Sequence, residues 1–183
     1  MGVGCFFQAS AAVKHLPAAA VLLLSLVALW FRPSPAAIVA QAEPGAPHGT
    51  REAWALDLLA RLGNSSPTPA TVAFVVAWTV AEDACMRDCG YSSAWERNNW
   101  LNSTMPGYGA YATIDGDGVK AYPDYESGMA ATIATLTNGL YDNIVAGLQT
   151  NDPERAYQAL ITSPWAGSRY GGGASFGQEW RQS

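Results

Sequence analysis

The longest apolar stretch of the chain lies near its start. Residues 16–31, "LPAAAVLLLSLVALWF", are interrupted only by one proline and one serine, and Lys14 is the only Lys or Arg before them. This length is short for a membrane-spanning helix and typical of a signal-peptide core. Residues 40–42, "AQA", have the form of a cleavage site. We therefore expect residues 1–42 to be a signal peptide or, because Arg32 lies in a long gap before that site, an uncleaved N-terminal membrane anchor.

Amphipathic helices separated by turn signals follow a Pro/Gly/Ala-rich linker at residues 43–50. Residues 51–62 have apolar side chains at helical spacing, and a glycine ends the pattern. The next helix is predicted from about residue 70 to residue 84 or slightly beyond, with Thr68 as its cap and Pro69 at its first position. Its "VAFVVAW" segment is apolar nearly all round, which predicts a central, buried helix.

Gly, Tyr, Asn and Thr dominate from Asn98 to Tyr122, where "DGDG" separates "YATI" from "VKAY". This pattern predicts a small β-hairpin. Three further helices are expected: one capped by Asp124, one over about residues 141–149, and one capped by Asp152. The predicted fold is mainly α with a small β-hairpin, an α+β class, in one domain at residues 51–168. Residues 169–183 form a Gly-rich tail in which Phe176 and Trp180 have the side chains needed to dock.

The charge of the chain limits its partners. Without residues 1–42, the chain keeps 8 Lys and Arg against 15 Asp and Glu, a formal charge of −7. An acidic chain without a cluster of basic residues argues against binding to nucleic acid or to an anionic membrane surface. Membrane contact is expected only through the N-terminal segment, if it stays uncleaved, and the domain is expected outside the cytoplasm.

Two of the three cysteines, Cys85 and Cys89, lie beyond the N-terminal segment. In an oxidising compartment an even count favours a disulfide between them. Side chains at i and i+4 of a regular helix rarely have the geometry of a disulfide, so a bridge would favour irregular backbone after Cys85. Two buried free thiols remain the alternative. With no histidine nearby, a zinc site is not expected.

Histidine occurs only at His15 and His48, outside the predicted domain. A domain without histidine cannot use Ser-His-Asp or Cys-His chemistry, nor the usual histidine-bearing catalytic zinc sites. No metal and no cofactor is therefore predicted. Carboxylates remain, and glycoside cleavage needs little more than one carboxylic acid and an attacking group.

A calcium loop is a second possible interpretation of "DGDGVKAYPDYE". Asp115, Asp117 and Glu126 fit three of the ligand positions. Lys120, however, occupies the position that requires glycine for the sharp turn. We therefore interpret this segment as a plain hairpin turn.

Glu82 and Asp83 fall at the predicted C-terminal end of the helix that starts at Pro69. The helix dipole disfavours negative charge there, which would tend to raise a carboxyl pKa. An aspartate next to Glu82 would raise the pKa of Glu82 further by like-charge repulsion, or else rotate away to solvent.

From residue 65 to residue 168 the order and spacing of a set of short motifs resemble lysozyme-like (muramidase or lytic transglycosylase-like) domains of actinobacterial and phage-associated cell-wall proteins. The matching positions are Ala77-Trp78, Glu82, Asn98-Asn99, Leu101-Asn102, Gly118-Val119, Tyr122-Pro123, Tyr125-Glu126, Gly128, Ala131-Thr132, Thr135-Leu136, Asn138-Gly139, Tyr141, Ile144, Leu148 and Ser163-Pro164-Trp165. The chain departs from the family after Glu82, where Asp83-Ala84 replace the usual glycines, and at Trp100, which replaces proline.

The resemblance implies a two-lobed, lysozyme-like fold with a cleft between helices and hairpin. It also implies cleavage of peptidoglycan or a related amino-sugar polymer, with Glu82 as the general acid. An attacking water would make the protein a hydrolase, whereas attack by the substrate's own 6-hydroxyl group would make it a lytic transglycosylase. The alternative is an inactive wall-binding or structural module on the same fold.

Candidate substrate-binding residues follow Glu82 in the sequence. They are Asn98, Asn99, Asn102, Tyr108 and Tyr122, with Tyr111 as a further candidate. Amides can hydrogen-bond N-acetyl groups, and aromatic faces can pack on sugar rings. Each also has a purely structural interpretation, since loop asparagines satisfy turns and strand tyrosines pack.

Other residues take secondary roles in this interpretation. Asp115 or Asp117 is a candidate second carboxylate, and Glu96 and Glu126 are substitutes for the acid. Trp54, Trp78 and Trp165 are assigned to the core.

Overall fold

The structure, a computed structural model, describes residues 49–165 and 179–182, all within one compact unit, Ala40–Ser183. The expected signal peptide or anchor, most of the linker and most of the Gly-rich tail lie outside the described residues. No helix in the described part of the chain has the length and apolar character needed to cross a membrane. The elements are α2 (Arg51–Arg61), α3 (Pro69–Asp88), β1 (Ala112–Thr113), β2 (Lys120–Ala121), α4 (Tyr125–Leu136), α5 (Asp142–Gln149), α6 (Pro153–Ile161) and the 3-10 helix η2 (Glu179–Gln182).

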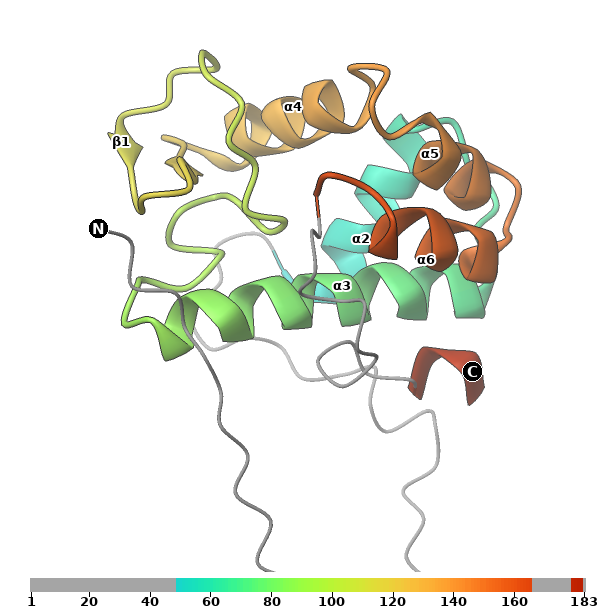
Figure 1. Cartoon of the computed structure of the whole chain (residues 1–183). Helices are drawn as coiled ribbons and strands as arrows, with labels where there is room; N and C mark the ends of the chain where they lie inside the picture. Colours follow the sequence, from blue (N-terminus) through green and yellow to red (C-terminus); the bar gives the residue numbers. More distant parts are fainter. Residues whose placement is uncertain (1–48, 166–178, 183) are drawn as a thin grey trace, which may run out of the picture. The chain divides into compact units, whose positions relative to one another are not determined.

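The expected α+β class is confirmed. Five α-helices and a two-stranded antiparallel sheet make up the described residues, and Ala112 pairs with Ala121 and Thr113 with Lys120. The strands flank the "DGDG" turn, as predicted. Figure 1 shows the hairpin at one end of the unit and α5 and α6 at the other, with the long helix α3 running beneath both.

The predicted caps are present at three helix starts. Thr68, Asp124 and Asp152 each accept a hydrogen bond from the backbone N–H three residues later. These side chains satisfy N–H groups that have no partner within a helix, which explains why each helix begins where the sequence predicts. The C-terminal end of α3 differs, because the helix continues to Asp88.

The core lies around α3. Trp54 of α2, Phe74 and Trp78 of α3 and Leu160 of α6 are at most 1% exposed. Trp100 is 4% exposed and stacks on Trp54 with ring centroids 5.9 Å apart, so it fills the core. Burial of these rings is the main stabilising contribution to the position of α3, on which the candidate acid is mounted.

Candidate active site

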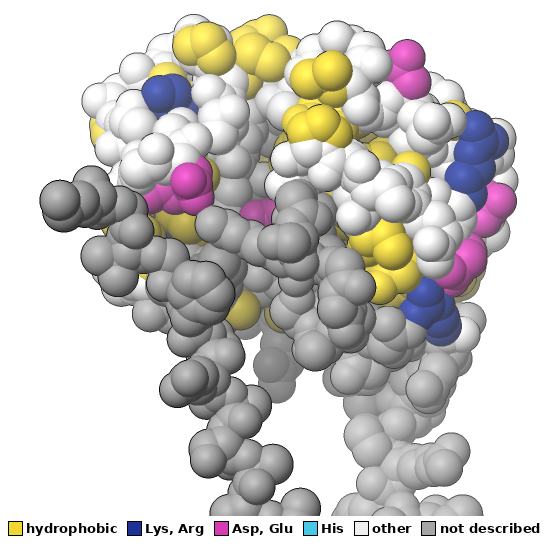
Figure 2. All heavy atoms as spheres, in the orientation of Figure 1, with side chains coloured by type: hydrophobic (Ala, Val, Ile, Leu, Met, Phe, Trp, Pro, Cys, Tyr) yellow, Lys and Arg dark blue, Asp and Glu magenta, His cyan; other side chains and the backbone are white. Residues whose placement is uncertain are grey.

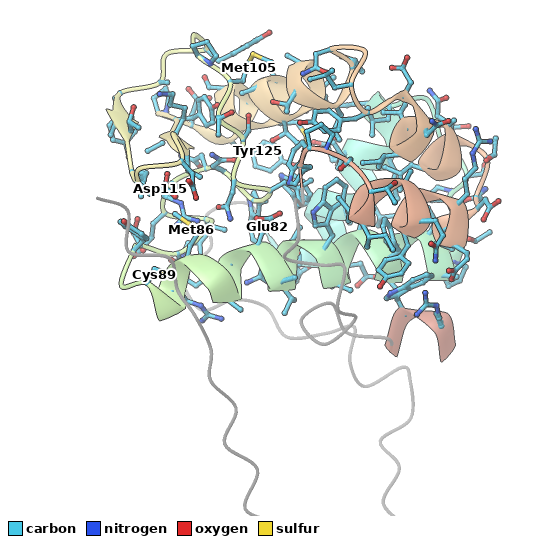
Figure 3. The ribbon with its side chains drawn as sticks, in the orientation of Figure 1. Glu82, Met86, Cys89, Met105, Asp115 and Tyr125 are labelled. Carbon is cyan, nitrogen blue, oxygen red and sulfur yellow. The ribbon has the colours of Figure 1, made fainter. Side chains whose placement is uncertain are left out.

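Glu82 lies in the body of α3, six residues before the helix ends at Asp88. The sequence-based expectation of a helix-ending glutamate is therefore wrong, and the dipole argument lapses because that effect is confined to the last turn. Figure 3 shows Glu82 rising from α3 toward the interior of the unit. Its side chain is not on a convex, solvent-facing surface, since the residue is only 8% exposed.

Three N–H groups of the described residues donate to the Glu82 carboxylate. Trp78 Nε1 and Trp165 Nε1 donate to Oε1 at 3.3 and 3.0 Å. Asn102 Nδ2 donates to Oε2 at 2.7 Å and to the backbone oxygen of Glu82 at 3.0 Å. These donors come from α3, from the segment after α6 and from the loop before the hairpin, so one carboxylate connects three separate parts of the fold.

The surface is hollowed above this carboxylate. Figure 2 shows a depression between the hairpin side and the helical side, with an acidic side chain visible inside it. Figure 3, in the same orientation, labels Glu82 at that place. Asn102 and Trp165 are both partly exposed, so two of the three donor residues border solvent. The depression thus leads toward a carboxyl group that is itself mostly buried and held in a fixed position.

Asp83 does not act on Glu82 as a neighbouring unpaired charge. It is fully buried, and its Oδ2 lies 2.9 Å from Arg51 Nη2 and 3.1 Å from Arg87 Nε. Its Oδ1 accepts a hydrogen bond of 2.8 Å from the backbone N–H of Ala94. Rotation to solvent, one of the two alternatives considered from the sequence, is therefore wrong, whereas repulsion of Glu82 by Asp83 stays a prediction. Asp83 joins α3 to α2 and to the loop that follows α3.

Of the three candidate asparagines, only Asn102 contacts Glu82 among the described contacts. Asn99 is fully buried and closes its own loop, donating to the backbone oxygens of Ser103 and Lys120 and accepting from the Ser103 N–H. Asn98 donates to the Tyr122 backbone oxygen at 3.0 Å. Asn99 therefore has a structural role, because burial keeps its amide away from any ligand, while Asn98 remains partly exposed.

The candidate tyrosines also differ in how far they are exposed to solvent. Tyr122 is fully buried, and its hydroxyl donates to the Met105 backbone oxygen at 2.8 Å. Burial raises the pKa of Tyr122. This corrects its assignment to substrate binding, since a buried ring cannot pack on a sugar. Tyr108 and Tyr111 are 43% and 65% exposed and keep that possibility.

The substitute acids are poorer candidates than Glu82. Glu96 is exposed and accepts from the hydroxyl and backbone N–H of Ser93, which lowers its pKa. Hydrogen bonds from Arg61 lower the pKa of Glu126. A lowered pKa makes a carboxyl group a poorer proton donor near neutral pH. Asp115 accepts from the Val119 N–H and closes the hairpin turn, as the plain-turn interpretation predicts.

The predicted disulfide remains a prediction, because the side chain of Cys85 lies outside the described residues. The backbone is regular here, since α3 runs through Cys85 to Asp88 and Cys89 is its C-cap. Within the described ranges, no group of three His, Cys, Asp or Glu side chains has the arrangement of a metal site.

Sequence reasoning missed two of the three donors. Trp78 and Trp165 were assigned to the core, and their rings do pack on each other with centroids 5.1 Å apart. The i, i+4 spacing of Trp78 and Glu82 was a usable signal, because such residues are neighbours on a helix face. Trp165 lies 83 positions from Glu82, and no local pattern reveals that contact.

The chain was also compared with known proteins. A scan against protein-family models, a search of curated proteins and a search of solved structures each returned no match.

Proposed function

We propose that this protein cleaves glycosidic bonds in the glycan strands of peptidoglycan, with Glu82 as the general acid. The proposal rests on the motif resemblance together with one structural observation. That observation is a mostly buried carboxylate, in a surface depression, held by N–H donors from three segments of the chain. The proposed location of the domain is outside the cytoplasm, where peptidoglycan lies.

The surroundings of Glu82 suit proton donation through the N–H donors that hold its carboxyl group. The indole N–H groups of Trp78 and Trp165 and the amide of Asn102 then stabilise the carboxylate that remains after the proton has moved to the glycosidic oxygen. Water or the 6-hydroxyl group of the sugar then attacks the anomeric carbon and gives up its proton to the Glu82 carboxylate. Attack by the acetamido group instead gives an oxazoline, which water opens in a second step. Attack by water gives a reducing end, and attack by the 6-hydroxyl gives an anhydro sugar.

A second candidate is a wall-binding module without catalysis. The observation that favours it is the exposure of Tyr108 and Tyr111 on the hairpin side. Exposed aromatic faces are suited to packing on sugar rings, and binding of that kind does not require Glu82.

The test uses the purified full chain, incubated with peptidoglycan, with soluble products identified by mass spectrometry. Wild-type protein is expected to release muropeptides, and Glu82→Gln, which keeps the size of the side chain but cannot donate a carboxyl proton, is expected to lose at least about 100-fold in rate. Glu96→Gln is the matched control and should keep wild-type activity, since Glu96 is exposed and contacts Ser93.

Two results would decide against catalysis by Glu82. Equal release by wild type and Glu82→Gln would remove its role as the acid. Absence of release from several wall types, together with co-sedimentation with the wall, would favour the binding module.

A further inference from the structure

Arg97 is a buried cation next to the candidate site. The residue is 1% exposed, although it lies in the loop between α3 and the hairpin. Within the described residues, its Nε and Nη1 atoms have no hydrogen-bond partner. Nη2 donates to Asn102 Oδ1 at 3.0 Å. A buried guanidinium with so few partners costs stability, which calls for another reason for its presence.

The contact with Asn102 continues to Glu82. Asn102 accepts from Arg97 through Oδ1 and donates through Nδ2 to Glu82 Oε2 at 2.7 Å. A guanidinium has only donors, so it can face only the oxygen of an amide. Arg97 therefore favours the orientation in which the Nδ2 end of the Asn102 amide faces Glu82. With the amide reversed, two oxygens would oppose each other at Glu82 and two donors at Arg97.

The backbone supports the same arrangement. Asn102 has φ of +54°, in the left-handed region that asparagine and glycine tolerate better than most residues. Its second amide hydrogen bond, to the Glu82 backbone oxygen at 3.0 Å, holds the side chain against α3. The position of the amide is therefore fixed by the chain, and its orientation is set at both ends, by the two acceptor oxygens of Glu82 and by the donor of Arg97.

The charges around Arg97 are acidic. The carboxylates of Asp83, Asp115, Glu96 and Glu82 all act on it, and they oppose the burial that lowers the pKa of Arg97. Asp83 also pairs with Arg51 and Arg87, and Asp115 accepts from the hairpin backbone. Glu82 is the acid that the Asn102 amide connects to Arg97 by hydrogen bonds.

We propose that Arg97 is a positioning residue for Glu82. By fixing the Asn102 amide with its N–H toward the carboxylate, Arg97 sets the orientation and the protonation equilibrium of Glu82 without touching substrate. The catalytic consequence rests on the function proposed above, whereas the effect on Glu82 itself does not.

The first test measures Glu82 without any assay of activity. The indole N–H signals of Trp78 and Trp165 in ¹⁵N-labelled full chain report on Glu82, because both groups donate to it. Their pH titration is recorded for wild type, Arg97→Met, Arg97→Lys and the control Arg155→Met, which changes an exposed arginine on α6. Arg97→Met is expected to raise the titration midpoint by about one pH unit or more, because a cation and an oriented donor that favour the carboxylate are lost.

The remaining variants test the route through Asn102. Arg97→Lys keeps the positive charge and one donor group, so its titration midpoint should lie between those of wild type and Arg97→Met. Asn102→Gly suits the positive φ and removes the amide. Arg97→Lys is then introduced into both wild type and Asn102→Gly. The shift in midpoint that it causes in Asn102→Gly should be less than half of the shift that it causes in wild type. Such non-additivity is expected when two residues act through one another. Unchanged midpoints in Arg97→Met, or full additivity in the cycle, would overturn the proposal.

The consequence for activity is a specific kinetic pattern. Arg97→Lys should lower kcat about tenfold, because the Asn102 donor that stabilises the Glu82 carboxylate after proton transfer loses its fixed orientation. KM should change less than about twofold, since the Arg97 side chain is buried away from substrate. An increase in KM with unchanged kcat would contradict a positioning role. If Arg97→Met does not fold, Arg97→Lys and Asn102→Gly carry the test. If wild type proves inactive, the indole titration still decides the proposal, so its failure and that of the glycosidase proposal are distinguishable.

Discussion

Two adjacent acids on α3 have opposite surroundings. Successive helical residues point about 100° apart, so Glu82 and Asp83 face different neighbours. Glu82 faces the depression and accepts from Trp165 and Asn102, whereas Asp83 faces α2 and pairs with Arg51 and Arg87. The residue that the sequence suggested as an electrostatic modifier of the acid is thus part of the framework.

We expect Asp83→Asn to reduce the free energy of unfolding by about 3–5 kcal/mol, because it leaves the guanidinium of Arg51, which is largely buried, without its carboxylate partner. Urea denaturation followed by circular dichroism measures the change. The matched control is Glu126→Gln, which breaks an exposed pair with Arg61 and should cost less than about 1 kcal/mol. Equal losses in both variants would show that the buried Asp83 pair stabilises the fold no more than the exposed Glu126 pair does.

Among the elements, α4 packs tightly against the loop that carries Asn98 and Asn102, and Gly128 is the point of contact. An ideal Cβ on Gly128 would lie 1.7 Å from the backbone oxygen of Asn98. Only a residue without a side chain fits there, and the contact sets α4 directly against the loop that carries Asn98 and Asn102. Register between helix and loop therefore depends on one glycine.

Gly128→Ala provides a test in which two effects have opposite signs. Helix propensity alone would stabilise α4 by up to about 1 kcal/mol. Because of the clash, we expect the free energy of unfolding to fall by about 1–3 kcal/mol in total, which would be seen as a lower Tm. Gly116→Ala in the hairpin turn is the matched control, since a Cβ added there would meet no atom within 4 Å, and its Tm should change little. A higher Tm for Gly128→Ala would contradict the close packing.

At the scale of the whole unit, the short helix η2 packs onto core residues of α3 and α6 that lie earlier in the sequence. Trp180 of η2 is 3% exposed, and its ring lies 5.2 Å from that of Phe74 in α3 and 5.7 Å from that of Tyr157 in α6. Arg181 lies over the Tyr157 ring at 4.7 Å. The sequence showed only that Trp180 has a side chain able to dock. The structure places this side chain in the core, so η2 is part of the packed unit.

Trp180→Ala is expected to lower the free energy of unfolding by about 3–5 kcal/mol, as for other large-to-small core changes. Chemical denaturation is the measurement. Leu140→Ala removes an apolar side chain that is 63% exposed and serves as the control, with an expected change within about 0.5 kcal/mol. If Trp180→Ala changed the free energy of unfolding no more than Leu140→Ala does, η2 would not contribute to the stability of the core.

The sequence predicted the features that depend on neighbouring residues. Thr68, Asp124 and Asp152 were found as caps because capping acts over three positions. The length of α3 was underestimated, since the tertiary contacts of Asp83 support residues that local propensity leaves undecided.

Contacts across the fold were not predictable in the same way. The donation from Trp165 to Glu82 and the pairing of Arg51 with Asp83 join residues 83 and 32 positions apart. Asn99 and Tyr122 were chosen for their chemistry, but burial, which depends on the complete fold, decided their role.

Arg51 links the two positions at which the chain departs from the lysozyme-like motif. It pairs with Asp83 at 2.9 Å, and its guanidinium lies 5.2 Å from the centroid of the Trp100 ring. A change at either position therefore alters the surroundings of the same arginine. In a lineage with glycine after the glutamate and proline before "LN", an arginine at this place would lose these two contacts. We expect the three positions to covary among homologues, and a sequence that keeps Arg51 while losing both contacts should be rare.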